Sequence, residues 1–263
     1  MRALARIVTL VAVAGAACMG GPEPTVDVAP RGPARIQPAA VARHAREFDE
    51  DLAQRPAGSQ DEAAAATYIL GHLQRAGYVV RLVAVPVADL VSSLDLVALP
   101  PADEEPETVV AVGYDSVSPG GTAEGESIGL FLELARALRA AEPRHTVELV
   151  ALGAEHARLG GGFLGSRRLV RLLQEAGANP LVVTIESTRP GRVAVIGAVD
   201  ELAAAARAAG VRTVAVGESE AGETASERHR IFALEGLQHA GLSGPPADLG
   251  PLLLEFLSAR QRS

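Results

Sequence analysis

The sequence predicts a three-layer α/β/α domain with a central, largely parallel mixed sheet. Two observations predict it: short apolar runs recur along the chain, and segments with apolar residues at helical spacing alternate with most of them. Short apolar runs between helices are typical of strands that are buried on both faces of a parallel sheet. With 263 residues, 48% of them hydrophobic, one domain can bury a full core without disulfides.

The first 37 residues are expected to lie outside this domain. Arg2 and Arg6 precede the apolar run 7–17, which ends in small residues, and this layout predicts a signal peptide over residues 1–18 and an exported protein. A helix over the apolar run would rise only about 16 Å, against a hydrocarbon core of about 30 Å, so a lasting membrane span is not expected. Frequent Pro and Gly predict a tether without helix or strand over residues 19–37.

The only cysteine, Cys18, directly follows Gly15-Ala16-Ala17. This segment resembles a bacterial lipoprotein cleavage site, in which Cys18 would be acylated and would anchor the protein to a membrane. Gly15 departs from the Leu that is usual there. The alternative is an ordinary cleavage site beside an incidental cysteine, which would release the protein into the periplasm or the medium, and both interpretations stay open. A single cysteine excludes a disulfide within the chain.

The predicted domain covers residues 38–263, and its elements follow in order. Helices are expected at 41–52 and 61–76, the second capped by Ser59 or Asp61 and ended by Gly77. Residues 78–87 favour extended backbone because valines dominate them. Further strands are predicted at 94–99, 108–112, 147–152, 181–185, 193–196 and 213–216, and further helices at 126–140, 162–176, 201–209 and 249–260.

Carboxylates follow three of the predicted strands. Asp115, Glu155 and Glu186 lie in the loops after residues 112, 152 and 185. In a parallel sheet the functional crevice lies at the carboxyl ends of the strands, so these loops are expected to meet at one edge. Converging carboxylates indicate a cation site.

Four short motifs in this region carry a resemblance. They are Arg55-Pro56-Ala57-Gly58-Ser59, Tyr114-Asp115-Ser116, Gly153-Ala154-Glu155 and Leu164-Gly165-Ser166. Their order and spacing over about residues 40–260 resemble the MH-clan zinc aminopeptidases. The resemblance implies the two-zinc exopeptidase fold, whose metal ions lie about 3.5 to 4 Å apart. In that family two His, two Asp and a Glu hold the zinc ions, and another Glu is the general base.

Carried over position by position, the resemblance implies that three metal ligands are lost. The first His falls on Gly113, and the bridging Asp of the segment 122–129 falls on Gly125. The last His has no counterpart in the segment 244–249. Two ligand positions keep a donor, with His156 in place of a Glu and Glu186 in place of an Asp. Two ligands are too few for a catalytic zinc, which ordinarily has three.

The general base falls on Glu155, and the Asp that supports the first His falls on Asp115. Bulk water has a pKa near 15.7 and becomes a nucleophile at neutral pH only when a metal lowers that pKa to about 7. Glu155 is therefore predicted to be an inert, partly exposed carboxylate that folding constraints retain. The predicted function is a non-catalytic peptidase-like protein without a cofactor, whose old active-site cleft binds a peptide or a protein.

A remodelled site is the first alternative. Asp115, His156 and Glu186, joined by His229 or Glu124, would hold one metal ion and give an active zinc-dependent aminopeptidase. His229 belongs to the segment 226–232, which resembles the family's Ser-Asp-His-x-x-Phe segment with one residue inserted. A solvated loop position is an equally open interpretation of His229. Three other histidines, in polar or amphipathic surroundings, are expected at the surface: His44, His72 and His145.

A serine hydrolase is the second alternative. Residues 125–129 match the Gly-x-Ser-x-Gly pattern with Ser127 as nucleophile. The pattern requires a sharp turn directly between a strand and a helix, whereas the segment 113–124 separates this match from its strand. The net charge of −8 gives no electrostatic basis for binding a phosphate backbone, so nucleic acid is not an expected partner.

Overall fold

The computed structural model describes residues 32–99, 105–116, 122–141, 146–157, 161–188, 190–197, 200–216 and 228–259. The predicted signal peptide with Cys18, most of the predicted tether, and His145 lie outside the described residues. Residues 32–37, the described end of the tether, contain no helix or strand.

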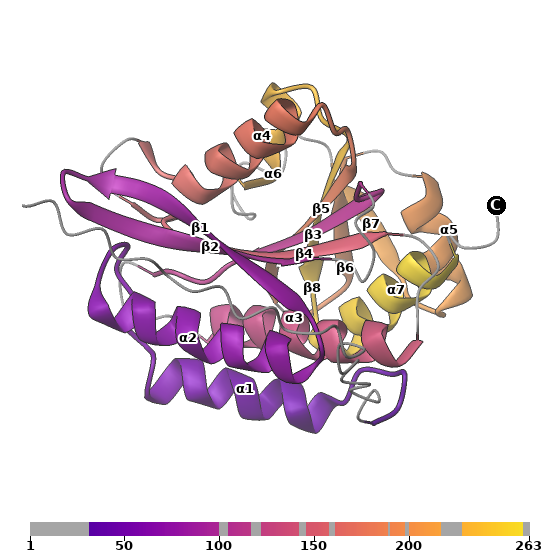
Figure 1. Ribbon diagram of the computed structural model, residues 1–263. Coiled ribbons are helices and arrows are strands. Elements are labelled where there is room, and N and C mark those ends of the chain that lie inside the picture. The colour runs from indigo at the N-terminus through magenta and orange to yellow at the C-terminus, as the bar shows by residue number, and fades with distance from the viewer. Residues whose placement is uncertain are drawn as a thin grey trace, which may run out of the picture.

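Eight strands form one mixed sheet in the order β1-β2-β4-β3-β5-β8-β6-β7 (Figure 1). Strands β4, β3, β5 and β8 run parallel at its centre, β1 and β2 are antiparallel at one edge, and β6 is antiparallel to β8. This confirms the predicted α/β class and the mixed, largely parallel sheet. The strands are β1 Val79–Ala88, β2 Val91–Leu99, β3 Thr108–Gly113, β4 Val147–Leu152, β5 Leu181–Thr188, β6 Val193–Ile196, β7 Thr213–Val216 and β8 His239–Gly244.

Helices cover both faces of the sheet and complete the three layers (Figure 1). On one face lie α1 Pro38–Glu50, α2 Gln60–Arg75, α3 Thr122–Ala141, α5 Asp200–Ala208 and α7 Pro246–Ala259, and on the other lie α4 Leu164–Ala176 and α6 Arg228–Leu234. Ser59 caps α2, because its side chain accepts a hydrogen bond from the backbone N–H of Glu62 at 3.1 Å. Within the described part of the chain, no helix has the length and apolar character needed to cross a bilayer.

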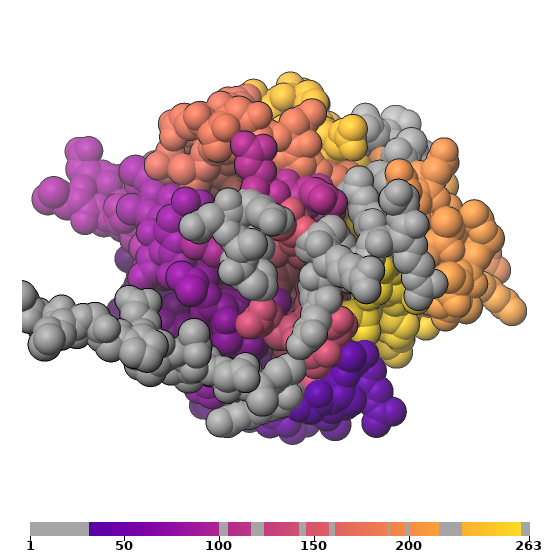
Figure 2. Space-filling model, turned by 45° about the vertical axis from the view of Figure 1, so that its right-hand side comes forward, coloured from indigo at the N-terminus to yellow at the C-terminus, as the bar shows by residue number. Residues whose placement is uncertain are grey.

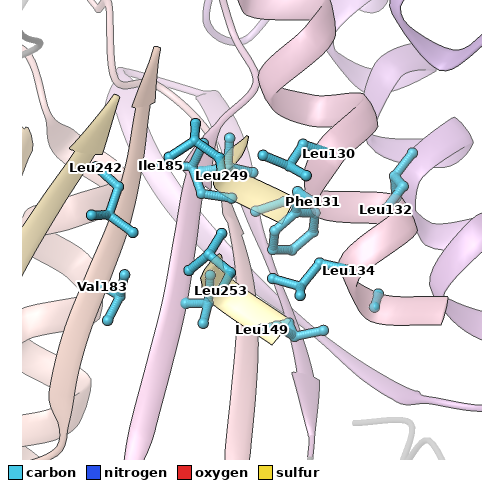
Figure 3. Packing of buried hydrophobic residues seen from close by; sticks show 14 of the residues in the cluster. Leu130, Phe131, Leu132, Leu134, Leu149, Val183, Ile185, Leu242, Leu249 and Leu253 are labelled. Carbon is cyan, nitrogen blue, oxygen red and sulfur yellow. The ribbon is translucent and has the colours of Figure 1, made fainter. Parts of the chain in front are cut away.

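The main core lies between the sheet and the helices α3 and α7. Figure 3 shows Phe131 and Leu134 of α3 and Leu253 of α7 pointing toward Leu149 of β4 and Val183 of β5, and all five are fully buried. Each large apolar side chain contributes roughly 1.5 to 3 kcal/mol when it is removed from water. This packing fixes the first turn of α3 beside the carboxyl ends of the central strands.

Helix α1 packs onto α3 at very short range. A Cβ atom built on Gly125 would lie 2.7 Å from the carbonyl oxygen of Ala45, and one on Gly129 would lie 2.6 Å from that of Val41. Because side chains at these two positions would collide with the backbone of α1, glycine allows the two helices to approach. Gly125 therefore faces α1 and not the edge of the sheet.

The β1–β2 hairpin extends beyond the rest of the molecule. Figure 2 shows it projecting at the left of the body. Leu90 in its turn is fully exposed, and Val79 and Leu82 of β1 are also exposed. The remaining strands of the sheet lie nearer the centre of the fold (Figure 1).

Candidate functional site

The candidate site lies where β3, β4 and β5 end and α6 begins. Asp115 follows β3, Glu155 follows β4, Glu186 lies near the end of β5, and His229 is the second residue of α6. The predicted convergence of the three carboxylates is found in the structure. All four of these residues are buried.

Asp115 organises the loop that follows β4. Its Oδ1 accepts a hydrogen bond from the backbone N–H of Glu155 at 2.9 Å, and its Oδ2 accepts one from that of His156 at 2.8 Å. The Nδ1 atom of His156 lies 3.1 Å from the carbonyl oxygen of Asp115 and 3.5 Å from its Oδ1. Hydrogen bonding to Asp115 raises the pKa of His156 against the opposing effect of burial. His156 therefore binds a proton more readily than an ordinary histidine.

Glu155 is buried, with 1% of its surface exposed, so the prediction of a partly exposed carboxylate is wrong. Its Oε1 accepts a hydrogen bond from the backbone N–H of Ser166 at 2.8 Å, and its Oε2 accepts one from the Ser166 hydroxyl at 2.8 Å. The Nε of Arg228 lies 2.6 Å from the same Oε2. Burial raises the pKa of Glu155, while Arg228 and Ser166 act against that rise.

Arg228, the first residue of α6, bridges two buried carboxylates. Its Nε contacts Glu155, and its Nη1 lies 3.4 Å from Oε2 of Glu186 and donates to the carbonyl oxygen of Ile185 at 3.2 Å. Burial lowers the pKa of Arg228, but Glu155 and Glu186 outweigh that effect and raise it above its ordinary value. The guanidinium group, only 3% exposed, is therefore a permanent buried cation.

The guanidinium group of Arg228 lies directly against Gly113 at the end of β3. A Cβ atom built on Gly113 would lie 2.2 Å from Nη2 of Arg228 and 3.2 Å from Cγ of Glu155. No side chain fits at position 113 while Arg228 holds this position. The resemblance assigns the family's first His ligand to this same residue, so the arginine lies beside the position expected for that ligand.

Glu186 and His229 form a second buried pair. The Oε1 atom of Glu186 accepts hydrogen bonds from the Thr184 hydroxyl at 2.6 Å and from the backbone N–H of His229 at 2.9 Å. The Nδ1 of His229 lies 3.3 Å from the same oxygen, and its ring stacks on that of His239 at 6.3 Å. With 1% exposure and a place on α6, His229 is not the solvated loop residue that its neighbours suggest.

Glu124, in the first turn of α3, contributes a carboxylate to the rim of the site. Its Oε2 lies 3.3 Å from Nη2 of the buried Arg55, whose Nε donates to the carbonyl oxygen of Tyr114 at 2.6 Å. Burial raises the pKa of Glu124, and nearby His156 and Arg55 oppose that rise. Because Gly125 faces α1, placing a lost bridging ligand there is a misassignment: the carboxylate that this segment offers at the rim is Glu124.

The described residues do not form a site that fits two zinc ions. Among them, no three His, Cys, Asp or Glu side chains are placed to share one metal ion. The predicted donors instead occur as separate pairs, His156 with Asp115 and His229 with Glu186, and the Arg228 guanidinium lies among the carboxylates. A buried cation repels a second cation at short range. These positions also do not assemble the remodelled one-metal site of the first alternative.

Ser127 lies inside α3 and not on a turn between a strand and a helix. It is buried, and its Oγ accepts a hydrogen bond from the backbone N–H of Thr188 at 3.2 Å. A nucleophile elbow exposes its serine at a sharp turn, so the structure contradicts the serine hydrolase interpretation.

Sequence reasoning did not find Arg228, although it singled out the adjacent His229. Burial of an arginine has no local signature here, because its partners Glu155 and Glu186 are 73 and 42 residues away along the chain. Ser166 belongs to a quoted motif, but its two hydrogen bonds to Glu155 emerge only in the structure.

Comparison with known proteins identifies the family and agrees with the fold. The sequence profile described as "Peptidase family M28" matches residues 96–231, slightly more than half of the chain. No curated protein sequence matches the chain.

Three solved structures illustrate the likeness in fold. The LapA aminopeptidase of Legionella pneumophila superimposes with a TM-score of 0.68 at 14% identity, covering 87% of this chain and 73% of that one. A leucine aminopeptidase precursor from Bacteroides thetaiotaomicron gives 0.67 at 14% identity and covers 85% and 97% of the two chains. A glutaminyl cyclase from an Acidobacteriales bacterium gives 0.67 at 17% identity and covers 89% and 98%.

Proposed function

The chain belongs to peptidase family M28, and on that premise we propose that it is an exported peptidase-like protein that does not hydrolyse peptides. In this proposal its old active-site cleft binds a peptide or a protein. The observation that carries the proposal is the position of Arg228, whose guanidinium group lies against Gly113 and bridges Glu155 and Glu186.

The charge of Arg228 disfavours a metal ion at this site. By the resemblance, the family uses the positions of Glu155 and Glu186 beside its metal ions. Here Arg228 contacts both carboxylates, at 2.6 Å and 3.4 Å, and supplies a fixed positive charge. A divalent ion brought to the same carboxylates would have to displace the arginine or meet its charge in a buried region, where such repulsion is poorly screened.

The surroundings of Glu155 do not suit a general base. Both oxygens of Glu155 already accept hydrogen bonds, from Ser166 and from Arg228. A base must lie within hydrogen-bond reach of the proton that it removes, and Glu155 has no exposed surface to offer. Without a metal, the water that it would have to activate keeps a pKa near 15.7.

The rim of the site presents two half-exposed side chains to a ligand. The side chains of His156 and Glu124 are 36% and 39% exposed. The raised pKa of His156 favours its cationic form beside the Glu124 carboxylate. Glu124 can pair with the ammonium group of a peptide and His156 with its carboxylate. We therefore propose a peptide terminus as the ligand.

Export and membrane anchoring belong to the same proposal. The basic, apolar and small-residue order of residues 1–18 supports a signal peptide, and Cys18 supports lipid anchoring at the cell envelope. The 19 residues between Cys18 and Pro38 would let the domain stand away from the membrane.

An active metal-dependent aminopeptidase is the second candidate, and it requires side chains at the rim to move, because the described residues do not form a metal site as they are placed. The two half-exposed donors at the rim, His156 and Glu124, are the observation in its favour. Its cofactor would be zinc.

One set of measurements on the full chain tests both candidates. The protein is incubated with zinc, dialysed and analysed for metal, and it is assayed with aminoacyl nitroanilides and with glutaminyl peptides, the latter because glutaminyl cyclases share the fold. The proposal expects no stoichiometric zinc and no turnover. Retained zinc together with turnover that a chelator and Glu155→Gln both abolish would establish the active enzyme.

Ligand binding is tested separately by calorimetry. A free tripeptide is expected to bind, and its N-acetylated amide, which lacks both terminal charges, is expected to bind at least about tenfold more weakly. Glu124→Gln should weaken binding of the free tripeptide and leave binding of the N-acetylated amide unchanged. Equal binding of the two peptides would contradict the proposed role of the rim.

A further inference from the structure

A second site lies on the helical layer, away from the ends of the strands. A cavity of about 170 Å³ opens between α1, α2 and α3. Its lining consists of Arg43, His44, His72, Arg75, Ala76, Leu132, Glu133, Arg136 and Arg139. Glu124 lies in the first turn of α3, and the nearest lining residue on this helix is Leu132, so at least about 12 Å of helix separates the cavity from the candidate site.

The cavity is strongly basic in a protein whose net charge is −8. Four arginines and one glutamate line it. Arg136 is engaged, because it donates to both oxygens of Glu133 at 2.9 Å and to the carbonyl oxygens of Pro33 at 2.9 Å and Arg35 at 2.7 Å. This network uses the only carboxylate among the described lining residues and connects the end of the predicted tether to α3.

The other three arginines have no carboxylate partner in the described part of the chain. Among the described residues, no Asp or Glu lies within 4.0 Å of the charged groups of Arg43, Arg75 or Arg139. The Nε of Arg139 is buried and has no hydrogen-bond acceptor in the described part of the chain, and its guanidinium lies 5.5 Å above the ring of Tyr78. A buried donor without an acceptor is costly, so an acceptor from outside the chain would stabilise this arrangement.

Two neutral histidines complete the cavity. The rings of His44 and His72 lie 4.6 Å apart, and Nδ1 of His44 is 2.8 Å from the Tyr68 hydroxyl. Burial, together with the positive charges of Arg43 and Arg75, lowers the pKa of both to about 4. His44 is therefore a buried residue and not the expected surface one. At neutral pH both imidazoles can donate a hydrogen bond while the positive charge comes from the arginines.

We propose that this cavity binds a phosphate group, held by Arg43, Arg75 and Arg139 with an imidazole N–H of His44 or His72. The planar guanidinium forms paired hydrogen bonds with phosphate oxygens, and such charge-assisted bonds are about twice as strong as neutral ones. Liquid water occupies about 30 Å³ per molecule, so 170 Å³ holds a phosphate group and a few further atoms. The site is independent of the function proposed for the old cleft.

The phosphate group has two possible sources, a free phosphorylated molecule and the headgroup of an anionic phospholipid. The cavity lies where the predicted tether joins the domain, since Arg136 binds residues 33 and 35 and Arg43 lies in α1. Residues 19–37 would span at most about 65 Å when extended. A domain anchored through Cys18 could therefore reach the headgroups of its own membrane.

The test uses the full chain, inorganic phosphate and a double variant. The imidazole NMR signals of His44 and His72 are expected to shift saturably with phosphate, whereas those of His239 on β8 stay in place. Arg43→Gln with Arg75→Gln should weaken phosphate binding about tenfold or more. The matched control is Arg46→Gln, an exposed arginine of α1 outside the cavity, which should change the affinity less than about twofold.

Vesicles distinguish the two sources. A lipid headgroup is identified if the protein binds vesicles that contain phosphatidylglycerol but not vesicles of pure phosphatidylcholine, and if the double variant loses this binding. A free molecule is identified if the protein binds phosphate but does not bind vesicles. The proposal fails if no imidazole shift saturates, if acetate shifts the signals as strongly as phosphate, or if Arg46→Gln weakens binding as much as the double variant. Unchanged circular dichroism and thermal midpoint confirm that the variants fold.

Discussion

The Arg228 guanidinium occupies the space that a side chain at Gly113 would need: a Cβ atom at residue 113 would lie 2.2 Å from its Nη2. The two residues come from the end of β3 and the start of α6 and are mutually dependent. The glycine admits the arginine, and the arginine keeps Glu155 and Glu186 from being buried as unpaired charges.

Gly113→Ala is expected to destabilise the protein by about 1 to 3 kcal/mol, because the added methyl group overpacks a site that the arginine fills. Combining it with Arg228→Gln should remove much of this cost, since the shorter side chain withdraws from Gly113. Urea unfolding of the two single variants and the double variant measures the coupling.

Gly71→Ala is the matched control for Gly113→Ala. Gly71 lies in helix α2, and the nearest neighbour of a Cβ atom added there would be the Arg75 side chain at 3.6 Å. Alanine favours a helix over glycine, so this variant should be neutral or up to about 1 kcal/mol more stable. Additive effects of Gly113→Ala and Arg228→Gln would show that the two residues do not share this space.

Arg228→Gln alone should cost about 3 to 5 kcal/mol, because it leaves two buried carboxylates without their cation. In this variant the folded pKa of Glu155 lies further above its unfolded value of about 4.3. A carboxylate with a raised folded pKa stabilises the fold below its unfolded pKa, and this contribution is lost as pH rises. The deficit of the variant should therefore grow between about pH 4 and pH 7.

Arg168→Gln provides the comparison for that prediction. Arg168 lies 3.9 Å from Glu175 in an exposed pair on α4. Such pairs contribute about 0 to 1 kcal/mol, so this variant should change stability little, with a much smaller pH trend than Arg228→Gln. A pH-independent deficit for Arg228→Gln would mean that charge is not the reason for its cost.

Asp95→Asn should stabilise the protein increasingly as pH rises. Burial, joined by nearby Glu155 and Glu62, raises the pKa of Asp95 well above its ordinary value. Its Oδ1 accepts from the backbone N–H of Gly153 at 3.0 Å, while its buried Oδ2 has no hydrogen-bond partner among the described residues. These contacts suit a neutral side chain.

The sign of this effect follows from linkage. Above about pH 4 the unfolded chain loses the Asp95 proton while the folded protein keeps it, so the wild type loses up to about 1.4 kcal/mol per pH unit until the raised pKa is passed. Asparagine does not titrate. Urea unfolding at several pH values should show diverging curves for Asp95→Asn and parallel ones for the exposed Asp89→Asn. Parallel curves for both would contradict a raised pKa of Asp95.

The fold was predictable because its signals are local. Apolar runs predict β3, β4 and β5. Because the carboxyl ends of parallel strands meet at one edge of a sheet, the convergence of Asp115, Glu155 and Glu186 was also predictable. Strand β8 was missed although it lies between β5 and β6, because His239–Gly244 contains two glycines and a serine, which have low strand propensity. Pairing on both sides forms this strand, and such pairing leaves no local pattern.

The candidate site was harder to predict, because its decisive contacts are distant in sequence. Arg228 and Glu155 are 73 residues apart, and nothing in either segment indicates the other. His44 was misplaced at the surface because Arg43 and Arg46 flank it. His44 lies three residues after Val41 and four before Phe48, so the helical period places it on the buried face of α1. For predicting burial, this period is a better guide than the polarity of the adjacent residues.

Adding a histidine at residue 113 while removing the internal cation should create metal binding. Gly113→His alone is expected to fail, because the imidazole would collide with Arg228. Arg228→Ala alone removes the cation but adds no donor. The double variant has room for the histidine beside Glu155 and Glu186 and leaves a net negative charge there, so its affinity for zinc should exceed that of either single variant by at least about tenfold.

Cobalt absorption and calorimetry with zinc measure this without any assay of turnover. The visible bands of Co²⁺ report how many protein donors surround the ion, and they should be strong only in the double variant. Arg228→Ala alone removes the same positive charge as the double variant but adds no histidine. Comparing the two variants therefore separates the effect of the added ligand from a general increase in attraction for cations. If Arg228→Ala bound zinc as tightly as the double variant, Arg228 alone would exclude the metal and Gly113 would be irrelevant. If neither bound zinc, a single added histidine would be insufficient, and the other lost donors would limit the site.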